Sequence, residues 1–425
     1  MERGCGMTAT EIAAMSGKLS RFLGQFDEHF VTCRGRAHLQ TYVEGQLGPL
    51  ERKSIEPIAD AAGVNSRTLQ EFLTILRWKE SGVRDQVQAI VARKYHGREC
   101  IVIVDESGYP KKGTATACVQ RQYCGATGKV DNCVIGIHLG FASDDFHTLI
   151  DADLYLPQSW HADAERRRKA RIPAEASYRP MHTIALGQIE RARESGVPIN
   201  WVIADERYGG VPAFMAQLES WGHSYVLEVP KSLSGWTRRP EVWETSTHGG
   251  DAAAGLRVFP RLAEDAPAPK KVENLVAHGH VFTHQPWIPF RIKDTLKGPD
   301  VWEVKSHAFF QHRDGLPSRP LTLLALRNVL DDTRKYFVAF APEGASLETL
   351  LRIAFNRWRI ERCFEDSKGE IGMDHFEVRG WRTIHRHLYL SLVSHLFLAE
   401  QKERLRGEKS EHHGLSASDR DALRA

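Results

Sequence analysis

Two short runs of apolar, mostly β-branched residues constrain the fold of this chain most. Residues 99–104 read Glu-Cys-Ile-Val-Ile-Val and residues 199–204 read Ile-Asn-Trp-Val-Ile-Ala, and an aspartate follows each run directly, Asp105 and Asp205. A continuous apolar run of this length is typical of a strand that is covered on both faces. Because open α/β sheets present ligand-binding groups at the carboxyl ends of their strands, the two aspartates are candidates for a shared cleft. Each also fits an ordinary turn or helix-capping aspartate.

The segments around these runs alternate strand and helix patterns. Further strands are predicted at residues 118–123, 133–142 and 225–229, and helices at residues 182–195 and 212–221. The first two of these strands, joined by a glycine-containing turn, would form a meander with the run that ends at Asp105. The pattern predicts an α/β unit over residues 96–231.

Three other regions have different patterns. Residues 1–95 show helix-like spacings and predict a helical N-terminal region, whereas residues 232–343 show short strand patterns broken by Gly and Pro and predict a mainly β insertion. Residues 344–405 return to helix patterns, and the polar residues 406–425 predict a loose tail. The expected fold is therefore an α/β core with a β insertion and a helical N-terminal region.

A helix–turn–helix pattern lies within the N-terminal region, at residues 54–71. Gly63 would form the turn between two helices, and Asn65 or Ser66 would cap the second. In DNA-binding proteins the second helix of such a pair enters the major groove. Because any hairpin of two helices shares this pattern, DNA binding and a purely structural role both fit the sequence.

Composition excludes several classes of protein. No apolar run reaches the ~18–20 residues of a membrane span, and residues 1–17 do not resemble a secretory signal, so we expect a cytoplasmic location. The seven cysteines are scattered without a C-x-x-C pair, which argues against a disulfide framework and a zinc site. The net charge of +3 is too small to indicate a polyanionic partner, but basic residues concentrate at 166–171 and 352–386. Such runs fit either phosphate binding or solvated helix faces.

A third acidic position lies in the predicted helix at residues 357–368. At about 100° per residue, Arg357, Glu361, Glu365 and Lys368 share one face of this helix, next to an apolar stripe. The acids would then lie at the edge of the core, where they could bind a metal ion. A ladder of ion pairs on a solvated face explains the same spacing.

Several separated motifs occur along the chain: Val104-Asp-Glu-Ser-Gly-Tyr-Pro-Lys-Lys-Gly113, Arg121-Gln-Tyr-Cys-Gly-Ala-Thr-Gly-Lys-Val-Asp-Asn-Cys133, Leu154-Tyr-Leu-Pro157, Ala204-Asp-Glu-Arg-Tyr-Gly209, Arg357-Trp-Arg-Ile-Glu361, His375-Phe-Glu-Val-Arg-Gly-Trp381 and His385-Arg-His387. Together they resemble the insertion-sequence-701 family of DDE transposases. The resemblance keeps the motif order of the family from about residue 20 to about residue 400. It implies an RNase H-like catalytic core with a mainly β insertion.

The same resemblance implies that Asp105, Asp205 and Glu361 are the catalytic residues and bind two Mg²⁺ ions, with Mn²⁺ as a substitute. Two such ions ~3.5–4 Å apart activate the attacking hydroxyl and stabilise the leaving oxygen of a phosphodiester, and carboxylate ligands suit them. In the wider group the glutamate lies in a pattern Tyr-x2-Arg-x3-Glu-x6-Lys. This chain has the arginine, glutamate and lysine at those spacings, but Ala354 in place of the tyrosine. Glu365 is the competitor for the third position.

Basic residues near the acids are expected to contact DNA phosphates; they are Arg357, Arg359, Lys368, Lys111 and Lys112. For Lys111 and Lys112 a plain surface role fits equally well. An aromatic side chain of the insertion could also stack on a flipped base. The candidates are Trp236, Trp287 and Trp302, and packing in the core is the alternative for each.

The resemblance finally implies a function, a DNA transposase that cleaves the ends of an insertion sequence and joins them to target DNA. Such an enzyme would act as a homodimer or larger assembly, in a bacterial cytoplasm and at the nucleoid when bound to DNA. Two alternatives stay open: a silent or domesticated DNA-binding relative that acts as a repressor, and an RNase H-like nuclease without strand transfer. The presence of all three acids argues against lost chemistry.

Overall fold

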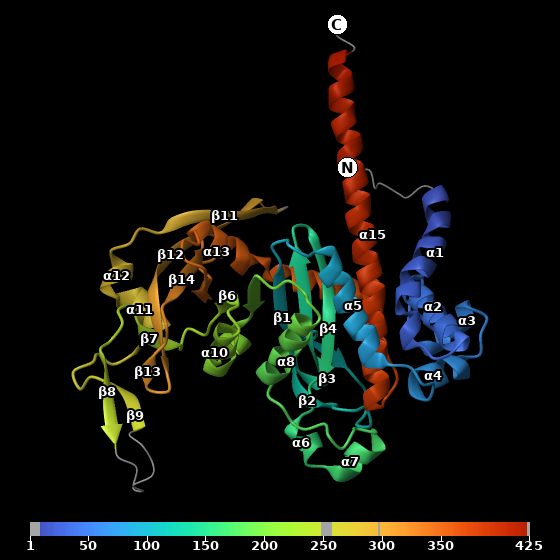
Figure 1. Cartoon of the computed structure of the whole chain (residues 1–425), viewed down its shortest axis with the longest axis horizontal. Coiled ribbons are helices and arrows are strands. Elements are labelled where there is room, and N and C mark those ends of the chain that lie inside the picture. Colours follow the sequence, from blue (N-terminus) through green and yellow to red (C-terminus); the bar gives the residue numbers. More distant parts are fainter. Residues whose placement is uncertain (1–8, 248–256, 296–297, 423–425) are drawn as a thin grey trace. The chain divides into compact units, whose positions relative to one another are not determined.

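The structure, a computed structural model, describes residues 9–247, 257–295 and 298–422. The chain divides into two compact units (Figure 1). Unit 1 comprises residues 1–198 and 359–425, and unit 2 comprises residues 199–358. The second unit is larger than the insertion predicted at residues 232–343, because strands that precede residue 232 pair with strands of the β-rich region.

An antiparallel sheet forms the centre of unit 1. Its strands are β1 (Ile101–Pro110), β2 (Gln120–Cys124), β3 (Lys129–Ser143) and β4 (Phe146–Leu154). β1 pairs with one edge of the long strand β3, and β2 and β4 pair with the other edge. The predicted meander is therefore wrong, since β3 lies between β1 and β2 and the sequence analysis did not predict β4. Residues 133–142 of β3 are buried and pair with β1, and most of them also pair with β4. The short strand β2 pairs only with the other end of β3, at residues 129–133.

The N-terminal part of unit 1 is helical. It contains α1 (Ala9–Leu23), a 3₁₀ turn η1 (Gly24–His29), α2 (Cys33–Leu47), α3 (Ile55–Ala61), α4 (Ser66–Thr74) and α5 (Glu80–Lys94). The expected helix–turn–helix geometry is present over α3 and α4. Gly63 between them has a φ of +63°, a conformation that glycine adopts without strain. The Asn65 side chain caps α4 by accepting a hydrogen bond from the Arg67 N–H.

The remaining helices of unit 1 are α6 (Gln158–His161), α7 (Ala164–Lys169), α8 (Met181–Glu194), α14 (Trp358–Gly369) and α15 (Trp381–Ala422). α5 and α8 cover one face of the sheet in Figure 1, and α14 packs on the opposite face. α15 continues as helix through Ala422. The prediction of a loose segment from residue 406 is therefore wrong up to that residue, and residues 423–425 lie outside the described residues.

Unit 2 is built mainly of strands. They are β5 (Trp201–Ala204), β6 (Ser224–Glu228), β7 (Ser234–Trp236), β8 (Val242–Thr247), β9 (Arg257–Leu262), β10 (Lys270–Lys271), β11 (Ile288–Thr295), β12 (Gly298–Arg313), β13 (Leu316–Pro317), β14 (Leu321–Asn328) and β15 (Arg334–Phe340). Within this unit the strand order is β10-β7-β12-β14-β15-β6-β5, β11 and β13 also pair with β12, and β8 and β9 form a separate hairpin. Only the pair β5 and β6 is parallel among the pairs described in unit 2.

Short helices complete unit 2. They are α9 (Glu206–Gly209), α10 (Pro212–Ser220), α11 (Val272–His278), α12 (His280–Thr283), α13 (Leu347–Ala354) and the 3₁₀ turn η2 (Phe355–Arg357). The helix pattern that begins in the predicted region 344–405 is thus interrupted by η2. The buried Asn356 side chain donates a 2.7 Å hydrogen bond to the Arg352 carbonyl, which stabilises the tighter η2 turn. Among the described residues, none of the helices is both long enough and apolar enough to cross a bilayer.

Candidate functional site

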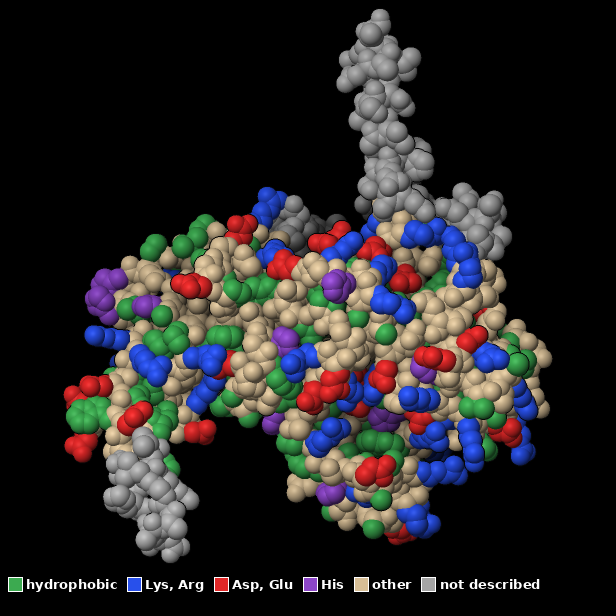
Figure 2. Space-filling view, viewed as in Figure 1, with side chains coloured by type: hydrophobic (Ala, Val, Ile, Leu, Met, Phe, Trp, Pro, Cys, Tyr) green, Lys and Arg blue, Asp and Glu red, His purple; other side chains and the backbone are tan. Residues whose placement is uncertain are grey.

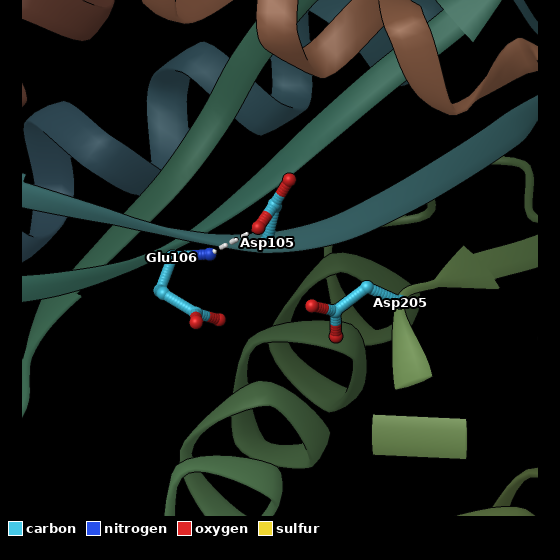
Figure 3. Close-up of side chains that lie close together, drawn as sticks. All are labelled: Asp105, Glu106 and Asp205. Atoms are coloured by element: carbon cyan, nitrogen blue, oxygen red, sulfur yellow. Dashed lines mark hydrogen bonds between the residues drawn. The ribbon is translucent and has the colours of Figure 1, made fainter. Parts of the chain in front are cut away.

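Asp105 lies in the middle of β1 and not at its end. The prediction that the strand ends there is wrong, because the ladder with β3 continues through Pro110 and pairs Asp105 with His138. The next residue, Glu106, is a second half-buried acid. The Asp105 carboxylate accepts a 2.8 Å hydrogen bond from the Glu106 N–H (Figure 3). The strand therefore holds two adjacent carboxylates where the sequence analysis singled out one.

Asp105 faces the side of the sheet on which α14 packs. Directly opposed residues of an antiparallel pair point to the same face, and Asp105 is opposed to His138. The His138 ring lies 5.3 Å from the Phe364 ring of α14, in an edge-to-face contact. Ile360, one turn earlier on α14, lies against Gly140, where a Cβ would meet it at 3.3 Å. α14 therefore runs across β3 beside the first acid.

Glu361 lies on α14 between these two contacts. It follows the buried Ile360 and precedes Phe364, and it is exposed. Ile360 contacts Gly140, which lies opposite Ile103 of β1, and Phe364 contacts His138, which lies opposite Asp105. Glu361 therefore lies between the levels of Ile103 and Asp105 along β1. Within unit 1, the helix that carries Glu361 thus packs on the sheet face to which Asp105 points.

The other two polar residues of this helix face lie further along α14. Glu365 forms an ion pair with Arg362 at 3.0 Å, and its side chain is 67% exposed. The Lys368 ammonium donates to the Gly108 carbonyl at 3.4 Å and lies 5.7 Å from the centre of the Tyr109 ring. Burial lowers the pKa of Lys368 from its ordinary value. Glu365 therefore has the surface ion pair considered as the structural alternative, and Lys368 lies against β1 beyond the acids.

In unit 2, Asp205 directly follows β5, as the apolar run predicted. Its carboxylate, drawn in Figure 3, caps α9. It accepts a 3.0 Å hydrogen bond from the Arg207 N–H. Burial raises the pKa of Asp205, against the opposing effects of Arg207 and of Arg357 in η2. Asp205 thus acts as an ordinary helix cap, but it is also half-buried and flanked by cations, an environment that is common at functional sites.

Lys111 and Lys112, predicted to contact DNA, have different surroundings. The Lys111 ammonium donates to the carbonyls of Asp374 and Phe376 at 3.0 and 2.8 Å, and lies 3.4 Å from the centre of the Phe376 ring. Burial lowers its pKa to about 8. Lys112 is exposed. The hydrogen bonds of Lys111 fix the segment after α14 to the end of β1, so its contacts in the structure are structural.

The two predicted arginines near Glu361 belong to different units. Arg357 ends η2 in unit 2, where its charge acts on Asp205. Arg359 is in unit 1, and its guanidinium donates to the carbonyls of Asp144 and Phe146 at the turn between β3 and β4. Arg357 therefore lies close to a predicted acid, whereas Arg359 anchors α14 to the sheet.

The three candidate stacking tryptophans all lie in unit 2. Trp236 and Trp302 are 4% and 8% exposed, and Trp302 packs on Phe355 with ring centroids 5.7 Å apart. Trp287 is partly exposed, and the cations of Lys305 and Arg327 lie 4.8 and 4.6 Å from its ring. The first two have the core environment given as their alternative, which leaves Trp287 as the most accessible of the three.

The sequence analysis missed two kinds of residue. Glu106 was quoted within a motif but not weighed as a ligand, although an acid adjacent to Asp105 was a visible signal. The support beneath Asp105 was also missed: the Tyr109 hydroxyl lies 2.7 Å from His138 Nε2, in full burial. Nothing in the spacing of Tyr109 and His138 indicates that they meet, because the contact depends on the β1–β3 register.

Comparisons with known proteins assign the family. The chain matches the model of the DDE superfamily endonucleases over residues 25–299, which is more than half of its length and includes Asp105 and Asp205. It is 30% identical over 189 residues to a probable transposase for insertion sequence element IS701 of Microchaete diplosiphon. This match covers 44% of the chain and spans only 46% of the relative's length. Together with the mixed α/β structure, the match confirms the predicted RNase H-like fold class, and the chain belongs to the DDE superfamily of endonucleases.

Proposed function

We propose that the protein is the transposase of an insertion sequence, which cleaves the element's ends with divalent metal ions and joins them to target DNA. The observation that carries the proposal is that α14, the helix of Glu361, packs on the sheet face to which Asp105 points, in a chain that belongs to the DDE endonucleases. The relative from Microchaete diplosiphon, itself a probable transposase, supports the strand-transfer part.

The donor set fits a hard divalent cation. Asp105, Glu106 and Asp205 each offer a carboxylate oxygen, and carboxylate oxygens are the ligands that Mg²⁺ and Mn²⁺ prefer. In our proposal Asp105, Asp205 and Glu361 hold two Mg²⁺ ions, with Glu106 as an additional ligand. Bound there, the ions would lower the pKa of an attacking water or 3′-hydroxyl and stabilise the leaving oxygen.

The protein's own residues would position the DNA around these acids. Arg357 lies near Asp205 and could bind a phosphate in bidentate fashion, whereas Lys368 would act as a point charge beyond Glu361. The exposed side chain of Glu361 leaves that acid accessible to a substrate. Lys112 is proposed as a further phosphate contact, while Lys111 and Arg359 orient backbone segments through carbonyl contacts.

Single substitutions test the proposed acids. Asp105→Asn, Asp205→Asn and Glu361→Gln should each reduce cleavage of a plasmid that carries the element with its natural flanks by about 10³-fold or more, because each removes a metal-binding charge. DNA affinity, measured by fluorescence anisotropy, should change little. Glu106→Gln should have a smaller effect if Glu106 only supplements the set. Full cleavage by any of the first three variants would remove that residue from the site.

Strand transfer separates the proposal from its alternatives. A pre-cut element end with a free 3′-hydroxyl should be joined to a target plasmid by the wild-type protein in Mg²⁺ or Mn²⁺. A nuclease without strand transfer would cleave the uncut substrate but yield no joined product. A silent relative that acts as a repressor would bind the same DNA without producing either product.

Assembly and domain roles complete the proposal. We propose a homodimer on paired ends, with residues 1–95 as the DNA-binding region, residues 96–231 and 344–405 as the catalytic core, and residues 232–343 as the insertion. Light scattering of the protein with and without end DNA would test the dimer. A strictly monomeric DNA complex that still joins ends would contradict it.

A further inference from the structure

A groove of about 830 Å³ opens beside α4, the second helix of the helix–turn–helix, and lies entirely in unit 1. Three segments far apart in the sequence form it: α4 with the start of α3, residues 169–171 at the end of α7, and residues 377–383 before and within α15. In Figure 2, Lys and Arg side chains gather at the lower right, around the place that α4 occupies in Figure 1. We call this feature the α4–α7 groove.

Each of the three segments contributes a cation to the α4–α7 groove. Arg67 comes from α4, Lys169 and Arg171 from the end of α7, and Arg379 from the segment before α15. Hydrogen-bonding side chains, Gln70 among them, line the same wall of α4. A surface that combines dispersed cations with uncharged donors is suited to a row of phosphates.

Three acidic residues line the groove; Glu56 is exposed, and the other two form ion pairs. Glu71 pairs with Arg67 at 3.2 Å on the same helix, and Glu377 pairs with Arg52. Arg171 and Arg379 are both exposed. The groove therefore presents its positive charge mainly through these two arginines.

The backbone holds the two exposed arginines in fixed positions. The Trp381 N–H donates to the Ala170 carbonyl at 3.0 Å, which joins the segment of Arg379 to the segment of Arg171. Arg171 has a φ of +54°, a left-handed conformation that costs a non-glycine residue about 1 kcal/mol or more. An arginine at a position suited to glycine directs a long cationic side chain out of the turn after α7.

We propose that the α4–α7 groove binds the sugar-phosphate backbone of duplex DNA, with Arg171 and Arg379 as its main phosphate contacts. The inference rests on the proposed function, since it names the surface that holds the enzyme's substrate. It assigns to DNA binding the end of the basic run, Lys169 and Arg171, and Arg379 of the motif from His375 to Trp381. Such contacts give affinity and orientation with little dependence on sequence.

The test measures binding of full-length protein to a random-sequence duplex of about 25 base pairs by fluorescence anisotropy, over about 50 to 200 mM salt. Arg171→Gln combined with Arg379→Gln should weaken binding about tenfold or more at ~0.1 M salt and reduce the log–log salt slope by about 2, since two phosphate contacts are lost. The control combines Arg168→Gln and Arg121→Gln, which removes two exposed arginines of unit 1 that do not line the groove. It should change the slope by less than about 0.5.

Equal slopes for the groove variant and the control would overturn the inference, as would an unchanged slope in the groove variant. Thermal unfolding of each variant checks that the fold is intact. If the double variant is unfolded, the single variant Arg379→Gln takes its place in the test, and it should lower the salt slope by about 1. The outcome is separable from the proposed function. If all acid variants lose cleavage but the groove variant keeps the wild-type salt slope, only the groove proposal is contradicted. If the groove variant shows the expected lower slope but the wild-type protein does not cleave, only the transposase proposal is contradicted.

Discussion

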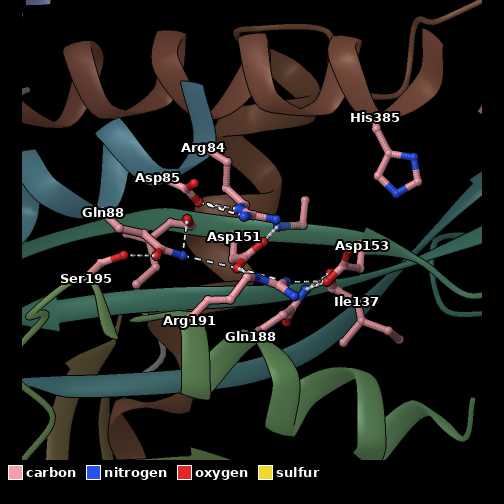
Figure 4. Close-up of polar contacts among 12 residues, drawn as sticks. Arg84, Asp85, Gln88, Ile137, Asp151, Asp153, Gln188, Arg191, Ser195 and His385 are labelled. Atoms are coloured by element: carbon pink, nitrogen blue, oxygen red, sulfur yellow. Dashed lines mark hydrogen bonds and ion pairs between the residues drawn. The ribbon is translucent and has the colours of Figure 1, made fainter. Parts of the chain in front are cut away.

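On one face of the unit 1 sheet, Asp151 and Asp153 of β4 lie against α8, whereas on the other face Asp105 of β1 lies beside α14. The β4 aspartates are neutralised: Arg191 of α8 binds both, and Gln88 donates to Asp151 at 3.1 Å (Figure 4). Burial raises the pKa of Asp151 despite Arg191, whereas Arg191 holds the pKa of Asp153 below its ordinary value. Asp105, by contrast, accepts a hydrogen bond from the Glu106 N–H and lies opposite His138, whose pKa is lowered to about 3 by burial.

This difference separates structural acids from acids available for chemistry. A buried carboxylate that is enclosed by arginine and amide donors has its charge satisfied and no reason to bind a cation. Asp105 is only half-buried, and we propose it as a metal ligand. We therefore expect substitutions on the β4 face to affect stability and substitutions on the β1 face to affect activity.

The largest effect on stability should come from Arg191→Met. The substitution leaves Asp151 and Asp153 buried without their cation, so it should lower the free energy of unfolding by about 3–5 kcal/mol. Asp105→Asn should change the same quantity by less than about 1 kcal/mol, because it leaves no buried charge without a partner. Urea unfolding of both variants measures the contrast. A stable Arg191→Met protein would show that the ion cluster is dispensable and that the two faces do not differ in this way.

Lowering the pH should reduce the free energy of unfolding through His138, whose ring packs against Phe364 of α14. Burial lowers the pKa of His138 to about 3, far below the 6.5 of the unfolded chain. The unfolded state alone then takes up a proton between these values, so stability is full above about pH 6.5 and falls as the pH decreases. From pH 7 to pH 5, this histidine alone should account for up to about 2 kcal/mol of lost stability.

The variant His138→Gln isolates this contribution. Its unfolding free energy should fall less between pH 7 and pH 5 than that of the wild type, whatever its stability at pH 7. The matched control is His96→Gln, at an exposed histidine of the same unit, which should keep the wild-type pH dependence. If both variants keep that dependence, His138 does not stay neutral in the native protein. Other buried histidines, such as His395 with a pKa of about 3, should preserve part of the slope.

The neighbouring lysines after β1 offer a smaller contrast. Lys111→Gln should lower the unfolding free energy by about 1–2 kcal/mol, because its ammonium bonds two carbonyls of the segment after α14. Lys112→Gln, at the exposed neighbour, should change stability by less than about 0.5 kcal/mol but weaken DNA binding if Lys112 contacts phosphate. Equal stability losses would show that the two carbonyl contacts contribute little to the fold.

The sequence predicted those parts of the site that depend on local pattern. The apolar run before Asp205 and the glycine turn at Gly63 needed only neighbouring residues, so their positions were predictable. Asp105 was placed at a strand end because polar residues follow it, whereas the pairing with β3 extends β1 to Pro110. The contacts of Tyr109 with His138, and of Arg191 with both β4 aspartates, join residues distant in sequence, and no local pattern encodes them.

The smallest effect should come from Glu365→Gln, which distinguishes the two glutamates of α14. Glu365 forms a surface pair with Arg362, so its loss should lower the unfolding free energy by only tenths of a kcal/mol. Glu361 lies between the contacts of Ile360 and Phe364 with the sheet, and it alone has the spacing to Arg357 and Lys368 that the pattern Tyr-x2-Arg-x3-Glu-x6-Lys requires. Cleavage by Glu365→Gln should therefore stay within about twofold of the wild type, far from the ~10³-fold loss expected for Glu361→Gln. A dead Glu365→Gln enzyme with an active Glu361→Gln enzyme would move the third ligand one helical turn along α14.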